Sequence, residues 1–331
     1  MVRLGAWRGR RWRPTFQRLL VPLDTSQRAE AALDHVRALA RVAPVKVTLL
    51  HVLEPTAAAG WDPLGYEFER GRATAYLEEV AGRLANDVPD VEVAVVDGQA
   101  ADAIARWAVE HNHDLVVLSA RGHGGGDGTG LGSVAHKLFS LPSVSVLLAR
   151  TDAPPPADDA GRRGYRRIVA PLDGSQRAEY AVAAAGEIAK AHDAELLLCH
   201  VITPLGLLNG TLRSPEARRH LERLMQTNQA EAEAYLTALA GRLATDGVRA
   251  RGLVHGHHGA PEHLHEAVSR EEPDLVVACA HGASGTGSLP FGRTVQTLAR
   301  FGSAPLLVVQ DLEAGAVAAA VAAAAEQRPG H

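Results

Sequence analysis

The segment best suited to chemistry is a glycine-rich loop that follows a short apolar run in the first half of the chain. It reads DLVVLSARGHGGGDGTGLGSVAHKL over residues 114–138, and nine residues separate Gly122 from the pair Gly132 and Ser133. Glycines let a backbone approach a phosphate closely, and successive N–H groups form an anion-binding nest. Ser133 opens a predicted helix, whose N-terminus favours negative charge. The loop therefore predicts a phosphate-binding site, although a solvated loop is the plainer alternative.

A second copy of this loop lies in the other half of the chain. It reads DLVVACAHGASGTGSLPFGRTVQTL over residues 274–298, and again nine residues separate two glycines, Gly282 and Gly292. Arg293 takes the place of the serine, and Thr294 comes one residue later. Arg293 could pair with a phosphate, or its bulk could fill the site, so both outcomes stay open for this copy.

The two loops belong to a duplication that covers most of the chain. LLVPLDTSQRAE at 19–30 matches IVAPLDGSQRAE at 168–179, and LLHV at 49–52 matches LCHV at 198–201. The landmarks keep the same order in both halves, with a period near 150 residues, which is too long for a solenoid. The duplication therefore predicts two whole domains in tandem.

Short apolar runs alternate with amphipathic helical patterns in each half, which is typical of an α/β fold. Strands are expected at 18–22, 45–52, 91–96, 115–119 and 144–149, and again at 167–171, 195–201, 250–254, 275–278 and 306–309. Helices are expected at 26–40, 73–84, 101–110 and 133–139, and again at 179–191, 215–244, 261–269 and 294–300. Ser26 is the expected N-cap of the first helix. Nearly continuous valine and leucine in the strands predicts an open, five-stranded, parallel, doubly wound sheet in each domain.

Composition shifts set the expected boundaries of these domains. We expect a disordered basic arm at 1–16, a first domain at 17–150, a linker at 151–164, a second domain at 165–311 and an alanine-rich tail at 312–331. Three consecutive prolines make the linker a stiff spacer. The arm is expected to be disordered rather than to bind nucleic acid or lipid, and the tail is assigned no function.

The composition of the 331 residues is ordinary for a soluble globular protein, with 46% hydrophobic and 22% charged residues. The net charge of -4 gives no indication of nucleic acid or an anionic membrane as a partner. The sequence contains no run of 18 apolar residues, so no membrane span is predicted, and no secretory signal is expected. Only two cysteines, Cys199 and Cys279, are present, which fits a reducing compartment. A cytoplasmic location is therefore expected.

These motifs together resemble the universal stress protein family. The resemblance rests on the PLDTS and PLDGS starts, the LHV of the second strand, the closing LPSVSVLLAR, and a loop close to the Gly-x2-Gly-x9-Gly-Ser/Thr pattern of ATP-binding members. It implies an adenine nucleotide α-hydrolase-like fold, binding of ATP with Mg²⁺ as a candidate companion, and a role in stress signalling. It also implies self-association through the last strands. Here 144–149 and 306–309 would form an intramolecular pseudo-dimer, with a homodimer as a further option.

The resemblance places the first ligand site on ten residues: Pro22, Asp24, Thr25, Val52, Ser119, Arg121, Gly122, Gly132, Ser133 and Val134. The carboxylate of Asp24 belongs on the ribose hydroxyls or the adenine amino group, because its charge is wrong for phosphate. The backbone of Val52 would meet the adenine. Arg121, His123 and Lys137 would add positive charge near the phosphates. Ser119 stands where the family has its first glycine, which predicts weakened rather than abolished binding.

The second site would consist of Asp173, Val201, Gly282, Gly292 and Thr294. Cys279 stands in the position of the first glycine there. Whether one domain or both bind a nucleotide is therefore left open.

Five histidines lie close together in the sequence of the second half and are a candidate metal site: His255, His257, His258, His263 and His265. His263 and His265 are two residues apart on a predicted helix, so they do not share a face. No cysteine lies nearby. We expect a solvated loop and no metal site, although the cluster borders the predicted cleft and could tune its pH dependence.

Catalytic motifs are missing from the sequence, which has no Gly-x-Ser-x-Gly elbow and no Gly-x4-Gly-Lys-Ser/Thr phosphate loop. The leading interpretation is therefore a nucleotide-binding stress protein that signals to an unknown protein partner, and not an enzyme. Two alternatives stay open. One is an interaction scaffold that has lost nucleotide binding, which Ser119, Cys279 and Arg293 favour. The other is a slow ATPase or autophosphorylating protein, with Ser133 as the acceptor.

Overall fold

The computed structural model describes residues 16–54, 63–122, 130–139, 141, 144–157, 164–202, 215–255, 264–282 and 291–311. The predicted tail, nearly all of the basic arm, the middle of the linker and the centres of both glycine loops lie outside the described residues.

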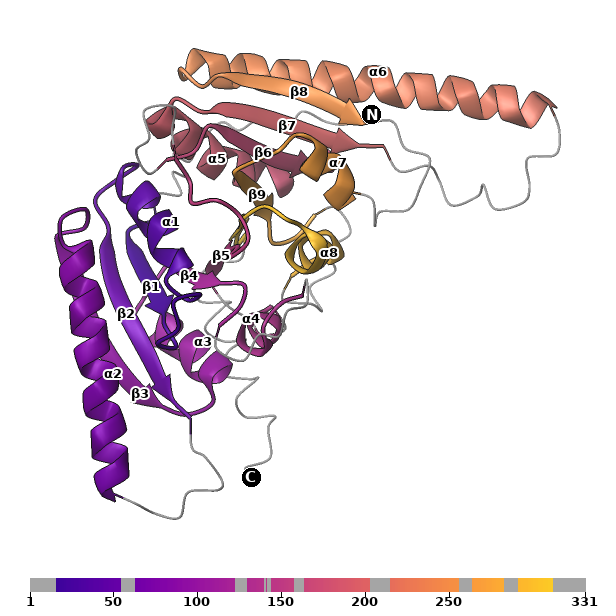
Figure 1. Ribbon diagram of the computed structural model, residues 1–331. Coiled ribbons are helices and arrows are strands. Elements are labelled where there is room, and N and C mark those ends of the chain that lie inside the picture. The colour runs from indigo at the N-terminus through magenta and orange to yellow at the C-terminus, as the bar shows by residue number, and fades with distance from the viewer. Residues whose placement is uncertain are drawn as a thin grey trace.

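The strands follow the predicted apolar runs within one or two residues at either end. The first half contains β1 (Arg18–Pro22), β2 (Lys46–Leu53), β3 (Asp90–Asp97), β4 (Leu115–Ser119) and β5 (Ser145–Ala149). The second half contains β6 (Arg167–Leu172), β7 (Glu195–Val201), β8 (Ala250–His255), β9 (Leu275–Cys279) and β10 (Leu306–Val309). In the described part of the chain these strands form a single sheet in the order β3-β2-β1-β4-β5-β10-β9-β6-β7-β8 (Figure 1).

Each half is a parallel, doubly wound sheet, as predicted. β1 pairs with β2 on one side and with β4 on the other, and β6 pairs with β7 and β9 in the same way. The strand order therefore reverses between β1 and β4, and between β6 and β9. Ligands of open α/β sheets bind at such switch points, beyond the carboxyl ends of the strands.

The two halves meet through their last strands. β10 pairs antiparallel with β5, with Leu306 opposite Leu148, Leu307 opposite Leu147 and Val308 opposite Val146. This is the pairing expected between 144–149 and 306–309. It removes two open sheet edges at once, because neither strand then exposes unpaired backbone groups on that side.

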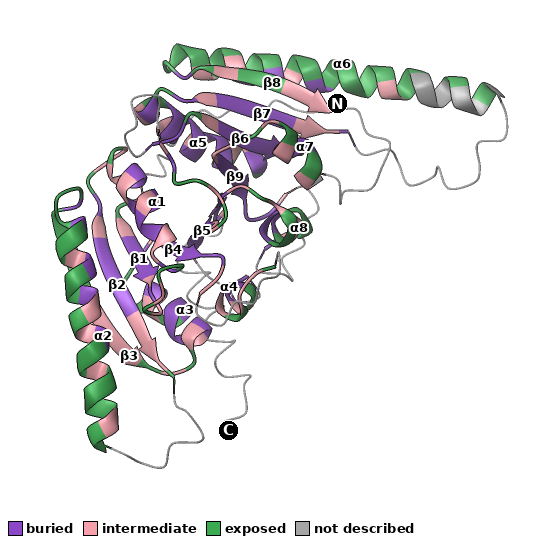
Figure 2. Cartoon of the chain, in the orientation of Figure 1, coloured by how far each residue is buried: buried purple, intermediate pink, exposed green. Residues whose placement is uncertain are grey.

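Helices cover both faces of the sheet. α1 (Ala31–Ala40), α2 (Pro63–Leu84), α5 (Ala178–His192) and α6 (Pro215–Thr245) pack on one face, and α3 (Ala100–Glu110), α4 (Ser133–Leu138), α7 (Leu264–Arg270) and α8 (Arg293–Phe301) pack on the other. Successive strand residues alternate between the faces, so Leu19 and Val21 contact the first group while Leu20 contacts the second. Both hydrophobic cores continue across β5 and β10, and Figure 2 shows the buried residues concentrated in the central strands.

The start of α1 differs from the prediction. Ser26 does not cap the α-helix, which begins at Ala31 and has Glu30 as its N-cap. Residues 26–30 instead form tight turns held by i to i+3 hydrogen bonds, such as Ala29 N–H to the Ser26 carbonyl at 3.1 Å. The Ser26 hydroxyl accepts the same N–H at 3.2 Å, so it caps this turn. The hydroxyl also donates to Asp24, which draws it toward the end of β1.

The helix α2 is ten residues longer at its start than the predicted span from Ala73. Pro63 stands at its first position, where its missing N–H costs nothing. The added part leaves Leu64 and Phe68 84% and 65% exposed, so apolar periodicity could not reveal it. Like α6, α2 follows the outer edge of its half (Figure 1).

A buried polar cluster joins the halves on the α1 side of the sheet. Tyr165, at the start of the second half, is fully buried, and its hydroxyl lies 2.9 Å from Nδ1 of His35 on α1. His192 of α5 packs edge-on against the Tyr165 ring, and its Nε2 lies 3.0 Å from the carbonyl of Ala38. Hydrogen bonds thus cross from each half to the other inside the shared core.

On the side of α8, Arg150 of the first half reaches the carboxyl end of that helix. Its guanidinium donates to the carbonyls of Leu298 and Ala299 at 3.1 and 2.6 Å. These carbonyls belong to the last turn, where a helix leaves its acceptors unsatisfied and favours a cation.

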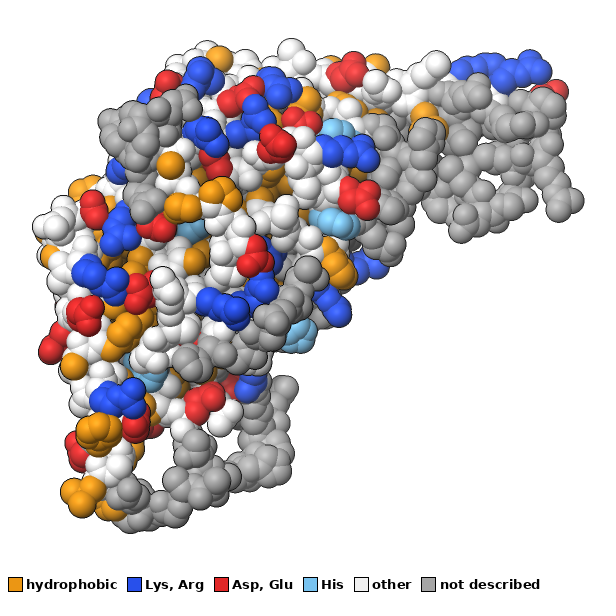
Figure 3. Space-filling view, viewed as in Figure 1, with side chains coloured by type: hydrophobic (Ala, Val, Ile, Leu, Met, Phe, Trp, Pro, Cys, Tyr) orange, Lys and Arg blue, Asp and Glu red, His pale blue; other side chains and the backbone are white. Residues whose placement is uncertain are grey.

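The molecular surface mixes both signs of charge. Acidic and basic side chains are interspersed over the face shown in Figure 3. Among the helices of the described residues, none combines the length and the apolar character that a membrane crossing requires.

Candidate functional site

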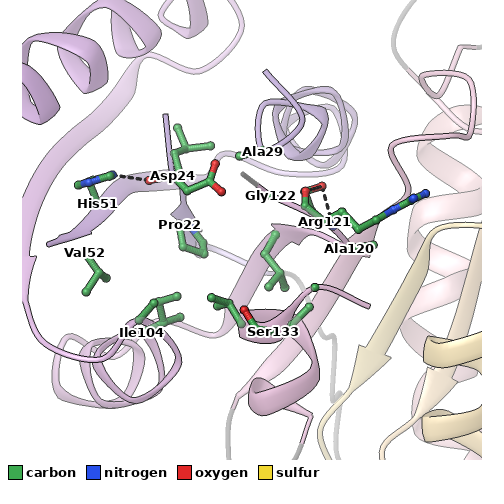
Figure 4. Close-up of a pocket in the computed structure, with 17 residues that line it drawn as sticks. Pro22, Asp24, Ala29, His51, Val52, Ile104, Ala120, Arg121, Gly122 and Ser133 are labelled. Atoms are coloured by element: carbon green, nitrogen blue, oxygen red, sulfur yellow. Dashed lines mark hydrogen bonds between the residues drawn. The ribbon is translucent and has the colours of Figure 1, made fainter. Parts of the chain in front are cut away.

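A pocket opens at the switch point of the first half, where β1, β2 and β4 end (Figure 4). Its cavity volume is about 140 Å³. Of the ten residues predicted for the first site, all except Thr25 line it: Pro22, Asp24, Val52, Ser119, Arg121, Gly122, Gly132, Ser133 and Val134. The fold therefore brings the PLDTS start, the LHV strand and both ends of the glycine loop to one place.

Asp24 is aimed into this pocket by a strained turn. Thr25 after it has a positive φ of 65°, a conformation that a β-branched residue rarely adopts. The equivalent position in the second half is Gly174, with φ 77°. Oδ1 of Asp24 accepts the backbone N–H and the hydroxyl of Ser26, at 3.1 and 2.5 Å. Thr25 thus serves the site through its backbone conformation, and its side chain is not part of the lining.

The glycine loop meets Asp24 without room for a side chain. A Cβ atom on Gly122 would stand 2.0 Å from Oδ2 of Asp24. The far end of the loop is fixed by Gly132, whose N–H donates to the carbonyl of Ala120 at 2.8 Å. A Cβ atom on Gly132 would lie 3.3 Å from that carbonyl oxygen. Close approach to Asp24 therefore leaves no room for a side chain at Gly122, whereas a side chain at Gly132 would need a shift of a few tenths of an ångström.

Ser119 braces the start of the glycine loop. Its hydroxyl donates to the carbonyl of Arg121 at 2.7 Å and lies 3.3 Å from the Arg121 N–H. The residue that replaces the first glycine thus braces the backbone that leads into Gly122.

The positive charges predicted for the phosphate end are engaged elsewhere. The guanidinium of Arg121 forms an ion pair with Asp152 and points away from the pocket (Figure 4). Lys137 pairs with Asp102 of α3 at 3.0 Å. His123 lies outside the described residues. Neither described cation therefore stands ready for a phosphate. Proximity in sequence did not predict the positions of these charges, because each side chain forms an ion pair with an acid on another segment.

Several lining residues were not predicted from the sequence: Leu23, Ala29, His51, Ala100, Ile104, Leu118, Ala120 and Ala135. Most supply an apolar wall beside Val52. His51 differs, because its Nδ1 lies 2.7 Å from the carbonyl of Leu23 and so ties β2 to the end of β1. The repeat contained a signal for it, since LLHV at 49–52 and LCHV at 198–201 share the histidine, at His51 and His200.

The second half repeats this frame. A Cβ atom on Gly282 would stand 2.2 Å from Oδ2 of Asp173, and the Gly292 N–H donates to the Ala280 carbonyl at 2.7 Å. Val201 ends β7 as Val52 lies near the end of β2. The predicted residues of the second site thus take up the same relative positions, with Thr294 in the first turn of α8.

The second half differs from the first in its side chains. Burial raises the pKa of the Cys279 thiol to about 12, so it is a protonated core residue and not a nucleophile. His281, which stands where Arg121 does, lies 2.6 Å from the buried carboxylate of Asp311. Arg293 faces a separate groove between α4 and α8.

The histidine cluster does not gather in the described residues. Nε2 of His255 lies 3.9 Å from Oε1 of Glu271, and the His265 ring lies tilted by 38° against that of Phe301, with centroids 5.8 Å apart. His257, His258 and His263 lie outside the described residues. No three potential metal ligands converge anywhere in the described part of the chain.

Comparisons with known proteins agree with this geometry. The pattern of the Universal stress protein family matches residues 15–150 and 164–310. A universal stress protein of Thermus aquaticus is 31% identical over 136 residues, which cover 41% of this chain and 99% of that protein. One from Mycolicibacterium smegmatis is 24% identical over 305 residues, covering 88% of this chain and 96% of that protein. A crystal structure of a universal stress protein from Archaeoglobus fulgidus superposes with a TM-score of 0.63 at 18% identity, covering 88% of this chain and 96% of that one, which shows the shared fold. Because the family pattern covers both halves, this chain belongs to the universal stress protein family, as a tandem two-domain member.

Proposed function

We propose that the first-half pocket binds an adenine nucleotide, with ATP as the preferred ligand, and that the bound state serves stress signalling. One observation carries the proposal. Asp24, the end of β2 at Val52 and the first turn of α4 at Ser133 line a single cavity at the switch point. A nucleotide needs an acceptor for its ribose, an apolar slot for its base and donors for its phosphates, and this cavity contains all three.

Each part of the nucleotide has a matching wall. Oδ2 of Asp24 can accept a ribose hydroxyl, while Ser26 holds the other oxygen. Ile104 and Val52 offer apolar surface to the adenine, whose edge can bond the backbone of Val52. At the other end, the Ser133 hydroxyl and the backbone of Gly132 and Ser133 suit the phosphates, because no described side chain caps α4.

The charges of the pocket lining favour magnesium as a companion of the nucleotide. Arg121 and Lys137 are paired with acids, so the described lining offers a triphosphate little positive charge. We propose that Mg²⁺ accompanies ATP and neutralises the phosphates, which are the ligands that this ion prefers. Asp24 is the only carboxylate among the described lining residues and lies at the ribose end. Among the described lining residues, none is a general base at the proposed phosphate end, which favours binding over hydrolysis.

The second-half frame is proposed as the weaker nucleotide site. Asp173 and Gly282 keep their contact, but Arg293 replaces the serine that would meet the phosphates. We further propose a cytoplasmic location, where the unpaired Cys199 and Cys279 stay reduced, and signalling to a protein partner.

The test is to denature freshly purified protein, identify any released nucleotide by mass spectrometry, and titrate stripped protein with ATP and magnesium by calorimetry. Asp24→Asn should weaken binding at least tenfold, and the matched Asp173→Asn should leave the tighter site unchanged. No released nucleotide and no heat with ATP would refute the proposal and favour the scaffold. Equal losses in both variants would place the binding in the second half as well.

A further inference from the structure

A second cavity lies between the two halves, formed by α4 of the first and α8 of the second, and it plays no part in the proposed nucleotide site. Its volume is about 270 Å³, larger than that of the first-half pocket. We call it the inter-half groove. Its walls include Leu131, His136 and Phe139 from the first half and Arg293, Arg300 and Phe301 from the second.

The charge of this groove has one sign. Arg293 and Arg300 both line it, and no acidic residue is among its described lining residues. Within the described part of the chain, neither arginine forms an ion pair with an acid. This sets them apart from Arg121 and Lys137, which are paired.

The two arginines share one face of α8. They are seven residues apart, which is two helical turns and a rise of roughly 10 Å. Arg300 also lies over the ring of Phe301, 5.4 Å from its centroid. At the aligned positions of the first half, the residues are Ser133 and Ser140, so the two cations are peculiar to the second half.

Guanidinium groups recognise phosphate through paired, charge-assisted hydrogen bonds. Two of them along one wall suit a ligand that carries several phosphate groups, and the aromatic floor of Phe139 and Phe301 suits an apolar or aromatic part. We infer that the inter-half groove is a binding site for a small polyphosphorylated ligand, separate from the first-half pocket. The site exists only when the halves are packed together, because each supplies one wall.

Calorimetric titration of the full chain with sodium tripolyphosphate, in a low-salt buffer without nucleotide, tests this site. The probe has no base, so it does not depend on the adenine slot. We expect one ion per chain in the groove. Arg293→Ser and Arg300→Ser, which copy the first-half residues, should each weaken it about tenfold or more, since one charge-assisted bond is lost. Arg106→Gln removes an exposed arginine of α3 that is distant from the groove in the chain and should change nothing.

The outcomes separate this site from the nucleotide site. Asp24→Asn should weaken the binding of ATP but leave the binding of tripolyphosphate intact. Loss of tripolyphosphate binding with Ser133→Ala, but not with either arginine variant, would place the ion in the first-half pocket and overturn the inference. The same conclusion follows if no tripolyphosphate binds or if Arg106→Gln has an equal effect. Circular dichroism checks that the variants fold, and both arginines are exposed, so two independent substitutions are available.

Discussion

Gly122 and Asp24 touch where β4 and β1 end, because a Cβ atom on the glycine would stand 2.0 Å from Oδ2 of the acid. The same contact joins Gly282 to Asp173 in the second half, at 2.2 Å. In each half, the glycine that begins the loop after the fourth strand thus lies directly against the acid that follows the first strand. The position of the carboxylate and the start of the glycine loop, at Gly122 or Gly282, are therefore fixed together.

Gly122→Ala is therefore expected to displace the Asp24 carboxylate or the loop. Asp24 cannot simply swing away, since its other oxygen holds Ser26. We expect ATP affinity at the first site to fall at least tenfold, as more than one contact is lost. The measurement is calorimetry with ATP and magnesium. Gly282→Ala makes the same change in the second half and should leave the tighter site intact. If Gly122→Ala bound ATP like the unaltered chain, this contact would have no role in the site.

The strands and the frame of the site were predictable because both depend on local chemistry. Runs of valine and leucine mark buried strands, and the repeated glycines mark close approaches. The destinations of long side chains were not predictable. Arg121 and Lys137 lie beside the loop in sequence, yet each pairs with an acid on another segment. The exposed start of α2 was missed for a related reason, since Leu64 and Phe68 bury little and leave no periodic pattern.

Arg150 offers a test of how firmly the halves are joined. Its guanidinium donates to the last-turn carbonyls of α8, and burial lowers its pKa to about 10. Arg150→Gln copies Gln310, the residue at the same place after β10. We expect it to lower the free energy of unfolding by about 2 kcal/mol, the value of a charged hydrogen bond to buried carbonyls. Urea denaturation measures the change.

The control for this prediction is Arg166→Gln, which removes an arginine that is 64% exposed. It should change the unfolding free energy by less than about 1 kcal/mol. Arg150→Lys keeps the charge but lacks the planar guanidinium, so its loss of unfolding free energy should lie between those of Arg150→Gln and Arg166→Gln. An unfolding curve for Arg150→Gln that overlays that of the unaltered chain would show that the contact with α8 contributes no stability.

Two buried histidines predict acid sensitivity. His35 bonds the hydroxyl of Tyr165, His113 bonds that of Thr48, and burial lowers the pKa of each imidazole to about 4. In the unfolded chain both titrate near 6.5. Between these values the unfolded chain binds protons that the folded chain does not, so stability is present above about pH 6.5 and declines as pH falls. Each histidine contributes about 3 kcal/mol once titration is complete.

Urea midpoints measured from about pH 7 down to about pH 5 test this slope. The window stops at about pH 5 because burial raises the pKa of Asp114 and Asp274. Protonation of these carboxyls at more acid pH raises the stability of the folded chain, which opposes the effect of the histidines. The double variant His35→Gln and His113→Gln should show a much shallower slope than the unaltered chain. A midpoint that stayed constant across the window in the unaltered chain would contradict the prediction.

The pairing of β5 with β10 predicts that the linker is not what holds the halves together. Three residue pairs, including Leu147 opposite Leu307, join the two half-sheets into one sheet, and both hydrophobic cores run across this junction. Replacing residues 158–163 with a protease recognition sequence and cleaving it should leave two fragments that elute together in size-exclusion chromatography. Val308→Pro removes a ladder hydrogen bond on the β5 side of β10, because the carbonyls of the alternate residues Pro305 and Val309 bond β9. Proline also cannot fit within a paired strand, so this variant should let the cleaved fragments separate. Uncleaved Val308→Pro chain, followed by circular dichroism, separates loss of pairing from loss of folding. If the fragments of the unaltered sequence separated at micromolar concentration, the junction would be a contact enforced by the tether, and the inter-half groove would lose one of its walls whenever the linker was cut.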